Sequence, residues 1–574
     1  MRNLMKYAFV LFAFAVLAYP LVAKQKHKQK QKTSQIDNLV DRIVAREKDE
    51  VETIRRFHPM VETYIQDTLP NKELGSVPVR DAYYLGVADF SSAVAEHSLL
   101  DPTGRLARLS KIVSSLNLGA ESYSPTGFLW MVFIGTKAFD RDHFHFEYVR
   151  REFLGEVRCI VFDVTPLPTT NGGFQGRFWA TEQDLTIVRF NGVFTPVSTF
   201  DGFNVHFDSW RGNLRPGLWL PTHVYSEETA LKDFLWGTRR FKSQIRLWGY
   251  DLTANAQQSE FSQMTIEAPG GIQDQAEASQ DASPIAAERL WRRAAEDNVV
   301  ERLQRSGLLA QPGTVDKILS TVVNNLEVTN NLDIQPEVRC RVLLTSTLES
   351  FSIGHTIVVS KGLLDVLPDE ASLAAILAQE LASVLLTEPK MDIWGFNDLT
   401  NIPAVDVIQR LKFRLPDHDL QLANEKAFEL LEKSPYKDKL VNAGLFLKQL
   451  EAERRVLPSL VEPRLGNPVV FADKLMASAP TLEPTNIDQT AALPLGGRIK
   501  VDPWNDEIVM NQSAQIRPTS PREKMPFEVT PFEPFLTYFK PASATVMEPV
   551  HGSTDAAVDT SDISKDSSTN IASH

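Results

Sequence analysis

The first regular pattern of apolar positions runs from residue 35 to about residue 69. Apolar side chains recur there at intervals of three, four and seven residues, which predicts an amphipathic helix. Pro59 interrupts the pattern, because a proline inside a helix removes a backbone donor. We therefore expect residues 24–76 to hold a basic segment and then a helix whose apolar face covers a sheet.

From residue 77 to about residue 255 the pattern changes to short runs of alternating apolar and aromatic residues. Glycine, proline and asparagine separate these runs, as is typical of strands joined by turns. The clearest predicted strands are 127–134, 143–149, 158–164, 176–180, 185–190 and 222–226. Asn191 and Gly192 both tolerate a positive φ, so we expect a hairpin turn at that pair. The pattern predicts a large antiparallel sheet or partial barrel over 77–255.

Three strings in this region carry a family resemblance: FDVTP, then GRFWATEQDLTIVRFNG, then GLWLPTHVYSE. Their order resembles the LolA-like superfamily of outer-membrane lipoprotein-sorting proteins. The resemblance implies a sheet that curves around an apolar concavity holding acyl chains. The aromatic residues that could line such a cavity are Phe128, Trp130, Phe133, Phe178 and Trp179. Ordinary core is our first interpretation of these side chains, because half of a sheet's apolar residues are buried in any case.

The remaining pattern divides the chain into four further segments, which makes the predicted fold class α+β with several domains. Residues 256–295 contain a linker, rich in Gln, Ala, Asp, Gly and Ser from 267 to 283, and the start of a helix. Residues 296–457 are predicted to be mainly helical with one pair of strands. Prolines scattered over 458–540 favour an extended segment wrapped on the preceding domain. Residues 541–574 are rich in Ser, Thr and Asp, so we expect a disordered tail.

The most informative stretch lies between residues 338 and 386. Residues 338–345 and 354–362 each predict a strand, and 369–386 predict a helix that no Gly or Pro interrupts. Asp369 is a suitable N-cap, because its carboxylate can accept a hydrogen bond from a backbone N–H of the first turn.

The string VVSKGLLDVLPDEASLAAILAQELA in this stretch resembles the gluzincin metallopeptidases of the HtpX and CAAX-prenyl-protease type. In that family the helix carries H-E-x-x-H, where the two His bind zinc and the Glu activates a zinc-bound water. A Glu on a later helix, in an E-x-x-A-D motif, is the third zinc ligand. The resemblance implies that residues 296–457 form a mainly helical domain of peptidase ancestry.

The positions that would bind zinc hold other residues in this sequence. Gln379 and Ser383 stand at the two His positions, and Leu420 stands at the position of the later Glu. Asn424 takes the place of the motif's Asp, and Glu380 remains as the vestige of the general base. Amide, hydroxyl and aliphatic side chains are poor zinc donors, so we expect no cofactor and no peptidase activity. A buried Glu380 should have a raised pKa, and should be protonated or bonded to a neighbour such as Ser383.

Two further predictions concern the same domain. A compensating zinc site built from His355, His418 and Glu380 is an alternative, with zinc as its cofactor. Separately, a retained cleft would hold an extended polypeptide by strand addition along an exposed edge strand. The residues of that predicted edge are His355, Thr356, Ile357 and Val358.

Composition and charge narrow the class of protein. The chain has 574 residues, of which 43% are apolar and 23% charged, so most of it should be globular. Sixty basic against 73 acidic side chains argue against a general nucleic-acid binder, which needs a basic face for phosphates. Two cysteines exclude a disulfide-stapled scaffold; Cys159 and Cys340 either pair or remain buried free thiols.

The amino terminus predicts export. Arg2 and Lys6 precede an apolar run from 7 to 23, which together predict a signal peptide over 1–23. Lysines alternate with Gln and His over 24–32, and positive charge there resists translocation, so an uncleaved membrane anchor is the alternative. Secretion across the inner membrane, to the periplasm, is the predicted localisation.

Three functions follow from these patterns. The first is an exported pseudopeptidase that acts as a binding or scaffold protein of the cell envelope, with a polypeptide or lipoprotein as partner. The second is an active zinc metalloendopeptidase with non-standard ligands. The third is a periplasmic lipid or lipoprotein carrier, with acyl chains bound in the β domain.

Overall fold

The structure is a computed structural model of the chain. It describes residues 35–71, 75–100, 125–135, 138–170, 172–195, 205–233, 237–252, 284–386, 413–469, 473–481, 483, 486, 489, 491–495, 499–502, 507–510, 529 and 535–540. The predicted signal peptide, linker and tail (1–23, 267–283 and 541–574) lie outside these residues. The chain divides into two units, Met1–Tyr538 and Phe539–His574, and every element below belongs to the first.

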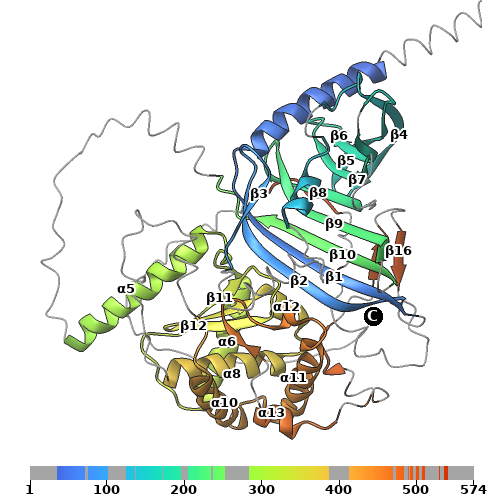
Figure 1. The fold of residues 1–574 in the computed structure, drawn as a ribbon. Helices are drawn as coiled ribbons and strands as arrows, with labels where there is room; N and C mark the ends of the chain where they lie inside the picture. The colour runs from blue at the N-terminus through green and yellow to red at the C-terminus, as the bar shows by residue number, and fades with distance from the viewer. Residues whose placement is uncertain are drawn as a thin grey trace, which may run out of the picture. The chain divides into compact units, whose positions relative to one another are not determined.

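The largest element is a ten-stranded antiparallel sheet in the order β3-β2-β1-β10-β9-β8-β7-β6-β5-β4. Its strands are β1 (Met60–Asn71), β2 (Gly75–Asp89), β3 (Ala95–Ser98), β4 (Phe144–Leu154), β5 (Val157–Pro166), β6 (Gly173–Thr181), β7 (Ile187–Thr195), β8 (His206–Arg215), β9 (Leu218–Asp233) and β10 (Gly237–Trp248). Figure 1 shows β1 and β2, in blue, beside β10 and β9, in green, although they are far apart in sequence. The predicted antiparallel sheet is confirmed, and it begins at Met60 rather than at residue 77.

The helix predicted from residue 35 ends at residue 54, before Pro59. The prediction that this helix resumes over 60–69 was wrong, because these residues form β1. Val61 and Ile65 of β1 are both buried on the same face of the sheet as the helix. A spacing of four fits one face of a helix and one face of a strand equally well, so the pattern did not distinguish them.

Two further local predictions were wrong. The run 127–134 forms the short helices α3 (Pro125–Leu129) and η1 (Trp130–Val132), because a continuous apolar run does not distinguish a buried helix from a buried strand. Asn191 and Gly192 lie inside β7 and not in a hairpin turn. Gly192 is needed there for a different reason: a Cβ at this position would lie 2.2 Å from a carbonyl oxygen of β6.

The second part combines a four-stranded sheet, in the order β11-β13-β12-β14, with helices, which confirms the α+β class. Its strands are β11 (Arg339–Leu343), β12 (Glu349–Ile353), β13 (Thr356–Ser360) and β14 (Asn467–Pro468). Its helices are α5 (Pro284–Arg305), α6 (Thr314–Thr329), α7 (Lys361–Val366), α8 (Glu370–Leu386), α10 (Asp417–Glu432), η4 (Lys437–Lys439), α11 (Leu440–Arg454), α12 (Pro458–Val461) and α13 (Asp473–Ser478). A separate antiparallel pair consists of β15 (Ile499–Asp502) and β16 (Glu507–Met510).

The strands predicted over 338–345 and 354–362 and the helix predicted over 369–386 are confirmed as β11, β13 and α8. Asp369 caps α8 as expected: its Oδ1 accepts the N–H of Ser372 at 2.8 Å. Strand β12 was not predicted, although it has five residues like β11 and β13. The segment after residue 458 is not wholly extended, since α12 and α13 lie in it. None of the helices in the described part of the chain is long and apolar enough to span a membrane.

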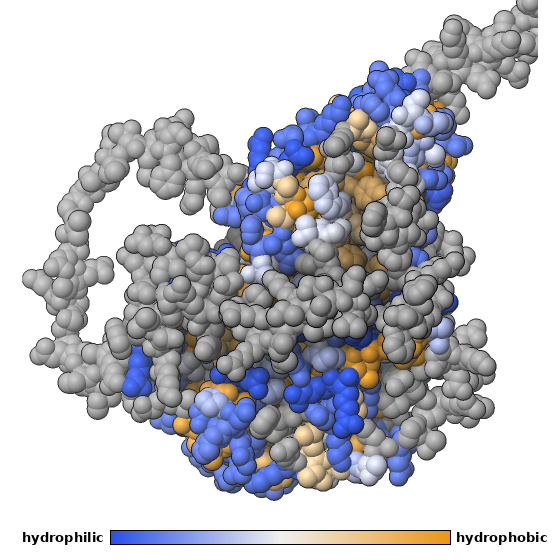
Figure 2. All heavy atoms as spheres, viewed as in Figure 1, coloured by the Kyte–Doolittle hydropathy of each residue, from blue (hydrophilic) through white to orange (hydrophobic). Residues whose placement is uncertain are grey.

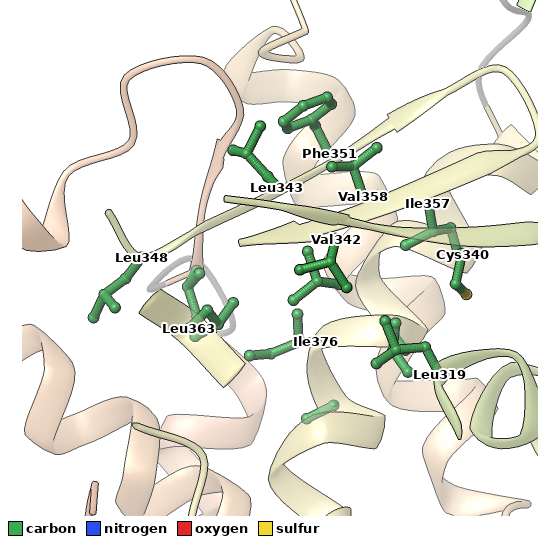
Figure 3. Packing of buried hydrophobic residues seen from close by; sticks show 14 of the residues in the cluster. Leu319, Cys340, Val342, Leu343, Leu348, Phe351, Ile357, Val358, Leu363 and Ile376 are labelled. Carbon is green, nitrogen blue, oxygen red and sulfur yellow. The ribbon is translucent and has the colours of Figure 1, made fainter. Parts of the chain in front are cut away.

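Both faces of the four-stranded sheet carry buried apolar side chains, and those on one face pack against α8. Figure 3 shows Phe351 and Val358 on one side of the strands, and Val342 on the other side towards Leu319 of α6 and Ile376 of α8. Phe351 and Val358 are opposite each other in the β12–β13 ladder, which explains why they share a face. The buried face of α8 is thereby fixed against the sheet, and Glu380 lies one turn further along the helix.

Polar groups of β1 and β2 join the ten-stranded sheet to this second part. The carboxylate of Glu62 accepts hydrogen bonds from the backbone N–H and the hydroxyl of Ser346, both at 2.7 Å. The carboxylate of Asp81 accepts the backbone N–H groups of Ser459 and Leu460 at 2.9 and 3.0 Å. Both carboxylates are buried, so these bonds form in a weakly screened environment.

Candidate functional site around Glu380

Glu380 lies on α8 and is fully buried. The hydroxyl of Ser350, on β12, donates to Oε1 of Glu380 at 2.7 Å, and Nδ2 of Asn467, on β14, donates to the same oxygen at 3.3 Å. Burial raises the pKa of Glu380 to about 7, and these two hydrogen bonds oppose the rise. Ser383, the predicted partner, was the wrong one: its hydroxyl donates to the backbone oxygen of Gln379 at 2.9 Å.

The edge of β12 next to Glu380 is occupied by β14, a segment of the same chain. The two strands are antiparallel, with Ser350 opposite Asn467. Asn467 is held at both ends, because its Oδ1 accepts the N–H of Leu415 at 2.9 Å while its Nδ2 reaches Glu380. At Gly466 a Cβ would lie 2.5 Å from the ring of Phe351, so only glycine permits this close approach.

Glu349, at the start of β12, anchors the chain that leads into β14. Its Oε2 accepts the consecutive backbone N–H groups of Arg464, Leu465 and Gly466, at 2.9, 2.7 and 2.8 Å. Three donors on one carboxylate oxygen stabilise its negative charge where water is excluded. This segment is therefore fixed beside β12 by the backbone, and the side of Glu380 that faces β12 is closed.

Gln379 and Asn424 line one cavity, whereas Ser383 and Leu420 do not. The cavity has a volume of about 310 Å³ and lies between α8, α10 and α13. Gln379 is 4% exposed, and its Nε2 has no hydrogen-bond partner among the described residues. Leu420 is fully buried in the apolar core at α10. The structure therefore brings together two of the four residues that the sequence comparison aligned with the peptidase motifs.

The predicted edge strand at residues 355–358 does not have a free edge. Thr356, Ile357 and Val358 lie on β13, which has β11 on one side and β12 on the other. Nδ1 of His355 lies 2.9 Å from the carboxylate of Glu296. The sequence located this strand correctly but gave no information on its position within the sheet.

The residues around Glu380 do not fit a zinc ion. The residues predicted to replace zinc ligands, Gln379, Ser383 and Leu420, are an amide, a hydroxyl bonded to its own helix and a hydrocarbon. The alternative set does not converge, since His355 bonds to Glu296 and His418 is exposed beside Asp419. Among the described residues, no group of three His, Cys, Asp or Glu side chains could hold a metal ion.

Both cysteines are free thiols in buried positions, so the alternative of a disulfide between them was wrong. Cys159 lies on β5 and Cys340 on β11. Burial raises the pKa of each thiol to about 12, which makes both poor nucleophiles.

A second candidate site is the apolar face of the ten-stranded sheet. Phe128, Phe133 and Phe178 belong to the buried cluster on this face, as their interpretation as core residues requires. Trp130 is 41% exposed, and Trp179 lies in the cluster on the opposite face of the sheet. We call the following strand residues of this cluster the phenylalanine face: Phe144, Phe162, Phe174, Phe178, Phe190, Phe207 and Phe241. The alternation of side chains along each strand is the signal that would have identified them.

The rings of the phenylalanine face pack against one another in groups. Phe162 and Phe178 are stacked, with ring centroids 5.4 Å apart and planes 18° apart. Phe190 and Phe207 meet edge to face at 5.9 Å. Such ring pairs stabilise a packed aromatic layer beyond the effect of area alone.

The helix over residues 35–54 covers this face. Its Val40, Ile43 and Val44 are buried in the same cluster as the rings, and Figure 2 shows the outward side of the helix as hydrophilic. Two hydrogen bonds, at 2.6 and 2.7 Å, join the buried Arg211 of β8 to the carboxylate of Glu47. This ion pair fixes the position of the helix over the sheet.

No protein-family model matches the chain, and no curated protein matches it. Among solved structures, it is similar to a LolA superfamily protein from Nitrosomonas europaea, with 10% identity and a TM-score of 0.17, over 36% of this chain and 93% of that chain. It is also similar to an outer membrane lipoprotein-sorting protein domain from Vibrio parahaemolyticus, with 7% identity and a TM-score of 0.16, over 35% of this chain and 90% of that chain. Scores of this size do not establish a shared fold.

Proposed function

We propose that this chain is a non-catalytic protein of the cell envelope that binds the acyl chain of a lipid or lipoprotein on the phenylalanine face. The observation that carries the proposal is a largely apolar sheet face covered by a separate amphipathic helix, residues 35–54. The strand order of the sequence resembles that of lipoprotein-sorting proteins, which favours the same class of ligand. The predicted signal peptide over 1–23 supports a role in the periplasm.

An acyl chain can replace the apolar side chains of the covering helix at little cost. Val40, Ile43 and Val44 keep the rings dry in the closed state. Apolar area contributes about 25 cal/mol per Å² whether a side chain or a ligand covers it, so the exchange is close to neutral. The ligand enters as the helix moves off the face.

Polar contacts at the rim of the sheet return the helix to one position after the ligand leaves. Besides the Glu47–Arg211 pair, Nε of Arg46 donates to the hydroxyl of Thr186 at 3.0 Å. Such contacts are directional, whereas contact between apolar surfaces fixes no register. In this proposal the apolar contacts provide most of the binding free energy, and the polar contacts at the edge of the sheet fix the position of the helix.

The α8 region is, in this proposal, a peptidase relative that has lost hydrolysis and serves as a binding or scaffold element. Its support is the chemistry at the former motif positions and the closure of the Glu380 site by β14. The triple variant Gln379→His, Ser383→His and Leu420→Glu should bind zinc, measured by elemental analysis of the purified protein. A folded triple variant without zinc would show that these helices do not correspond to those of the peptidases.

Binding of cis-parinaric acid, whose fluorescence rises in an apolar site, tests acyl-chain binding. We expect the full chain to bind the probe and palmitate to displace it. Phe162→Leu should weaken binding several-fold, because it removes a ring from the face. The matched control is Val161→Ala, the neighbouring residue of β5, which is buried on the opposite side of the sheet and should leave binding unchanged. Absence of probe binding by the folded wild type would exclude the proposal.

A further inference from the structure

A groove of about 760 Å³ runs between helix α6 and strand β11, away from both sites described above. One wall consists of five consecutive residues, from Glu337 to Arg341. The other wall is a stripe along α6 that includes Asp316, Ser320 and Glu327. A long groove along one edge of a strand has the shape of an extended polypeptide.

Strand β11 is at the end of the four-stranded sheet, with β13 as its only sheet neighbour in the described chain. The N–H of Arg339 donates to the carbonyl of His355 at 2.9 Å, so residue 339 directs its backbone groups towards β13. Backbone groups alternate along a strand, so those of Cys340 are directed outward, into the side of the groove.

Part of this outer edge is already paired in the antiparallel direction. The carbonyl of Val342 accepts the N–H of Ala310 at 2.9 Å, and the N–H of Leu344 donates to the carbonyl of Leu308 at 2.8 Å. The chain then turns away at Pro312, which lines the groove. The pairing therefore stops beside Cys340, and no strand of the described chain pairs with the preceding part of the edge, from Glu337. The carbonyls of Cys340 and Glu337 instead accept side-chain hydrogen bonds, from Nη1 of Arg341 at 3.1 Å and Nη1 of Arg293 at 3.3 Å.

Four polar atoms of the groove lining have no hydrogen-bond partner among the described residues. Two are acceptors, Oδ1 of Asp316 and Oε1 of Glu327, and two are donors, Nε of Arg339 and Nε of Arg341. Asp316 is 7% exposed, and its other oxygen, Oδ2, accepts the N–H of Gly313 at 2.7 Å and lies 3.9 Å from Nη1 of Arg341. Buried polar atoms normally have partners, and a peptide backbone supplies both a donor and an acceptor at every residue.

The charges in the groove favour a basic side chain on the occupant. The cations of the lining are Lys317, Arg339 and Arg341; Arg339 is paired with Asp297 at 2.6 Å, and Arg341 lies 3.9 Å from Asp316. Burial and the neighbouring carboxylate of Glu337 raise the pKa of Glu327. Two carboxylates without a cation between them are stabilised when a Lys or Arg lies beside them.

We propose that this groove binds an extended polypeptide segment that carries a basic residue, paired antiparallel to the outer edge of β11. The segment continues the line of residues 308–310 and forms backbone hydrogen bonds with Cys340. Its basic side chain lies beside Glu327 and Glu337. This assignment is independent of acyl-chain binding, since the groove shares no residue with the phenylalanine face.

Hydrogen exchange of the full chain, measured by mass spectrometry, tests the proposal. The probe is a synthetic peptide of alternating Val and Lys, and its control replaces the central Val by Pro, which lacks a backbone donor. We expect the Val-Lys peptide to slow exchange over 337–341, and the Pro peptide not to do so. Equal protection by both peptides, or no protection at saturation, would overturn strand pairing at β11.

Two neighbouring residues of α6 provide matched variants. Glu327→Lys should weaken peptide binding roughly tenfold, because it places like charges together. Val328→Lys adds the same charge at a position that is 65% exposed and should change binding little. An equal effect of the two variants would exclude this groove as the site. Protection of 337–341 that rises with protein concentration without peptide would assign the groove to a second copy of the chain and overturn the proposal.

Discussion

Arg189 and Asp208 in the ten-stranded sheet and Glu380 on α8 are equally buried but differ in their partners. In the sheet, the guanidinium of Arg189 is bonded to both oxygens of Asp208, at 2.9 and 3.0 Å, and both side chains are 1% exposed. Trp179 and Trp210 lie over the same guanidinium, with ring centroids 4.3 and 4.4 Å from its Cζ. In the α8 region, Glu380 is equally buried but has only a hydroxyl and an amide as partners.

The two sites differ in whether the buried charge has an opposite charge beside it: Asp208 has Arg189, whereas Glu380 has only neutral donors. A buried ion pair in which the guanidinium bonds both carboxylate oxygens keeps both groups ionised. A buried carboxyl without an opposite charge is protonated more easily, as the raised pKa of Glu380 reflects. A general base that has lost its metal would be left in this condition, which is how we interpret Glu380.

The largest expected effect on stability comes from removing one partner of the buried Arg189–Asp208 pair. Arg189→Met should lower the free energy of unfolding by about 3–5 kcal/mol, because it leaves Asp208 buried without an opposite charge. Urea unfolding at neutral pH measures the loss. The double variant Arg189→Met with Asp208→Leu should recover most of it. A loss under about 1 kcal/mol in the single variant would mean that this pair is no better matched than Glu380.

The second effect concerns pH. The pKa of Glu380 in the fold, about 7, exceeds the usual value of 4.5, so the unfolded chain loses this proton first as pH rises. The stability that protonated Glu380 contributes is therefore complete below about pH 4.5 and is lost as pH rises through about 7. Glu380→Gln should remove up to about 3 kcal/mol of this pH dependence.

Urea unfolding of wild type and Glu380→Gln at several pH values measures this effect. Burial raises the pKa of Glu96 to about 7 as well, but Glu96 is present in both proteins, so their difference isolates Glu380. Parallel pH profiles for the two proteins would contradict the contrast between the regions.

The smallest effect is expected for an ion pair at the surface. Arg141 bonds both oxygens of Asp41, on the covering helix, at 2.7 and 2.9 Å, but both side chains are largely exposed. Arg141→Ala should cost no more than about 1 kcal/mol, because water screens the pair. It should also speed the uptake of cis-parinaric acid less than Glu47→Gln does, since Glu47 is buried. Stopped-flow fluorescence compares the two rates, and the reverse order would show that the exposed pair controls the helix.

Much of the fold could be predicted from the sequence because it depends on local periodicity. The period of two identified β4, β5, β6, β7 and β9, five of the ten strands of the large sheet, and the uninterrupted apolar run with Asp369 before it identified α8. Residues 60–69 and 127–134 were assigned incorrectly, because their apolar spacing fits a helix and a strand alike.

The candidate sites were predicted less well, because they depend on contacts between distant residues. Burial of Glu380 followed from its position on an apolar helix, but Asn467 as its partner could not be foreseen, since nothing local marks β14 as a strand. The predicted edge at β13 was wrong for the same reason: strand order is decided by pairing between segments far apart in the chain.

The pairing of β1 with β10 has a consequence for how the chain reaches its native state. Strand β1 is made early in translation, but its neighbour β10 follows only after β2 to β9. Until then the outer edge of the β1–β2 hairpin is open to other chains, a recognised route to aggregation. Folding of the large sheet is therefore a late, non-local event, and a chain cut short before β10 should depend on chaperones to stay in solution.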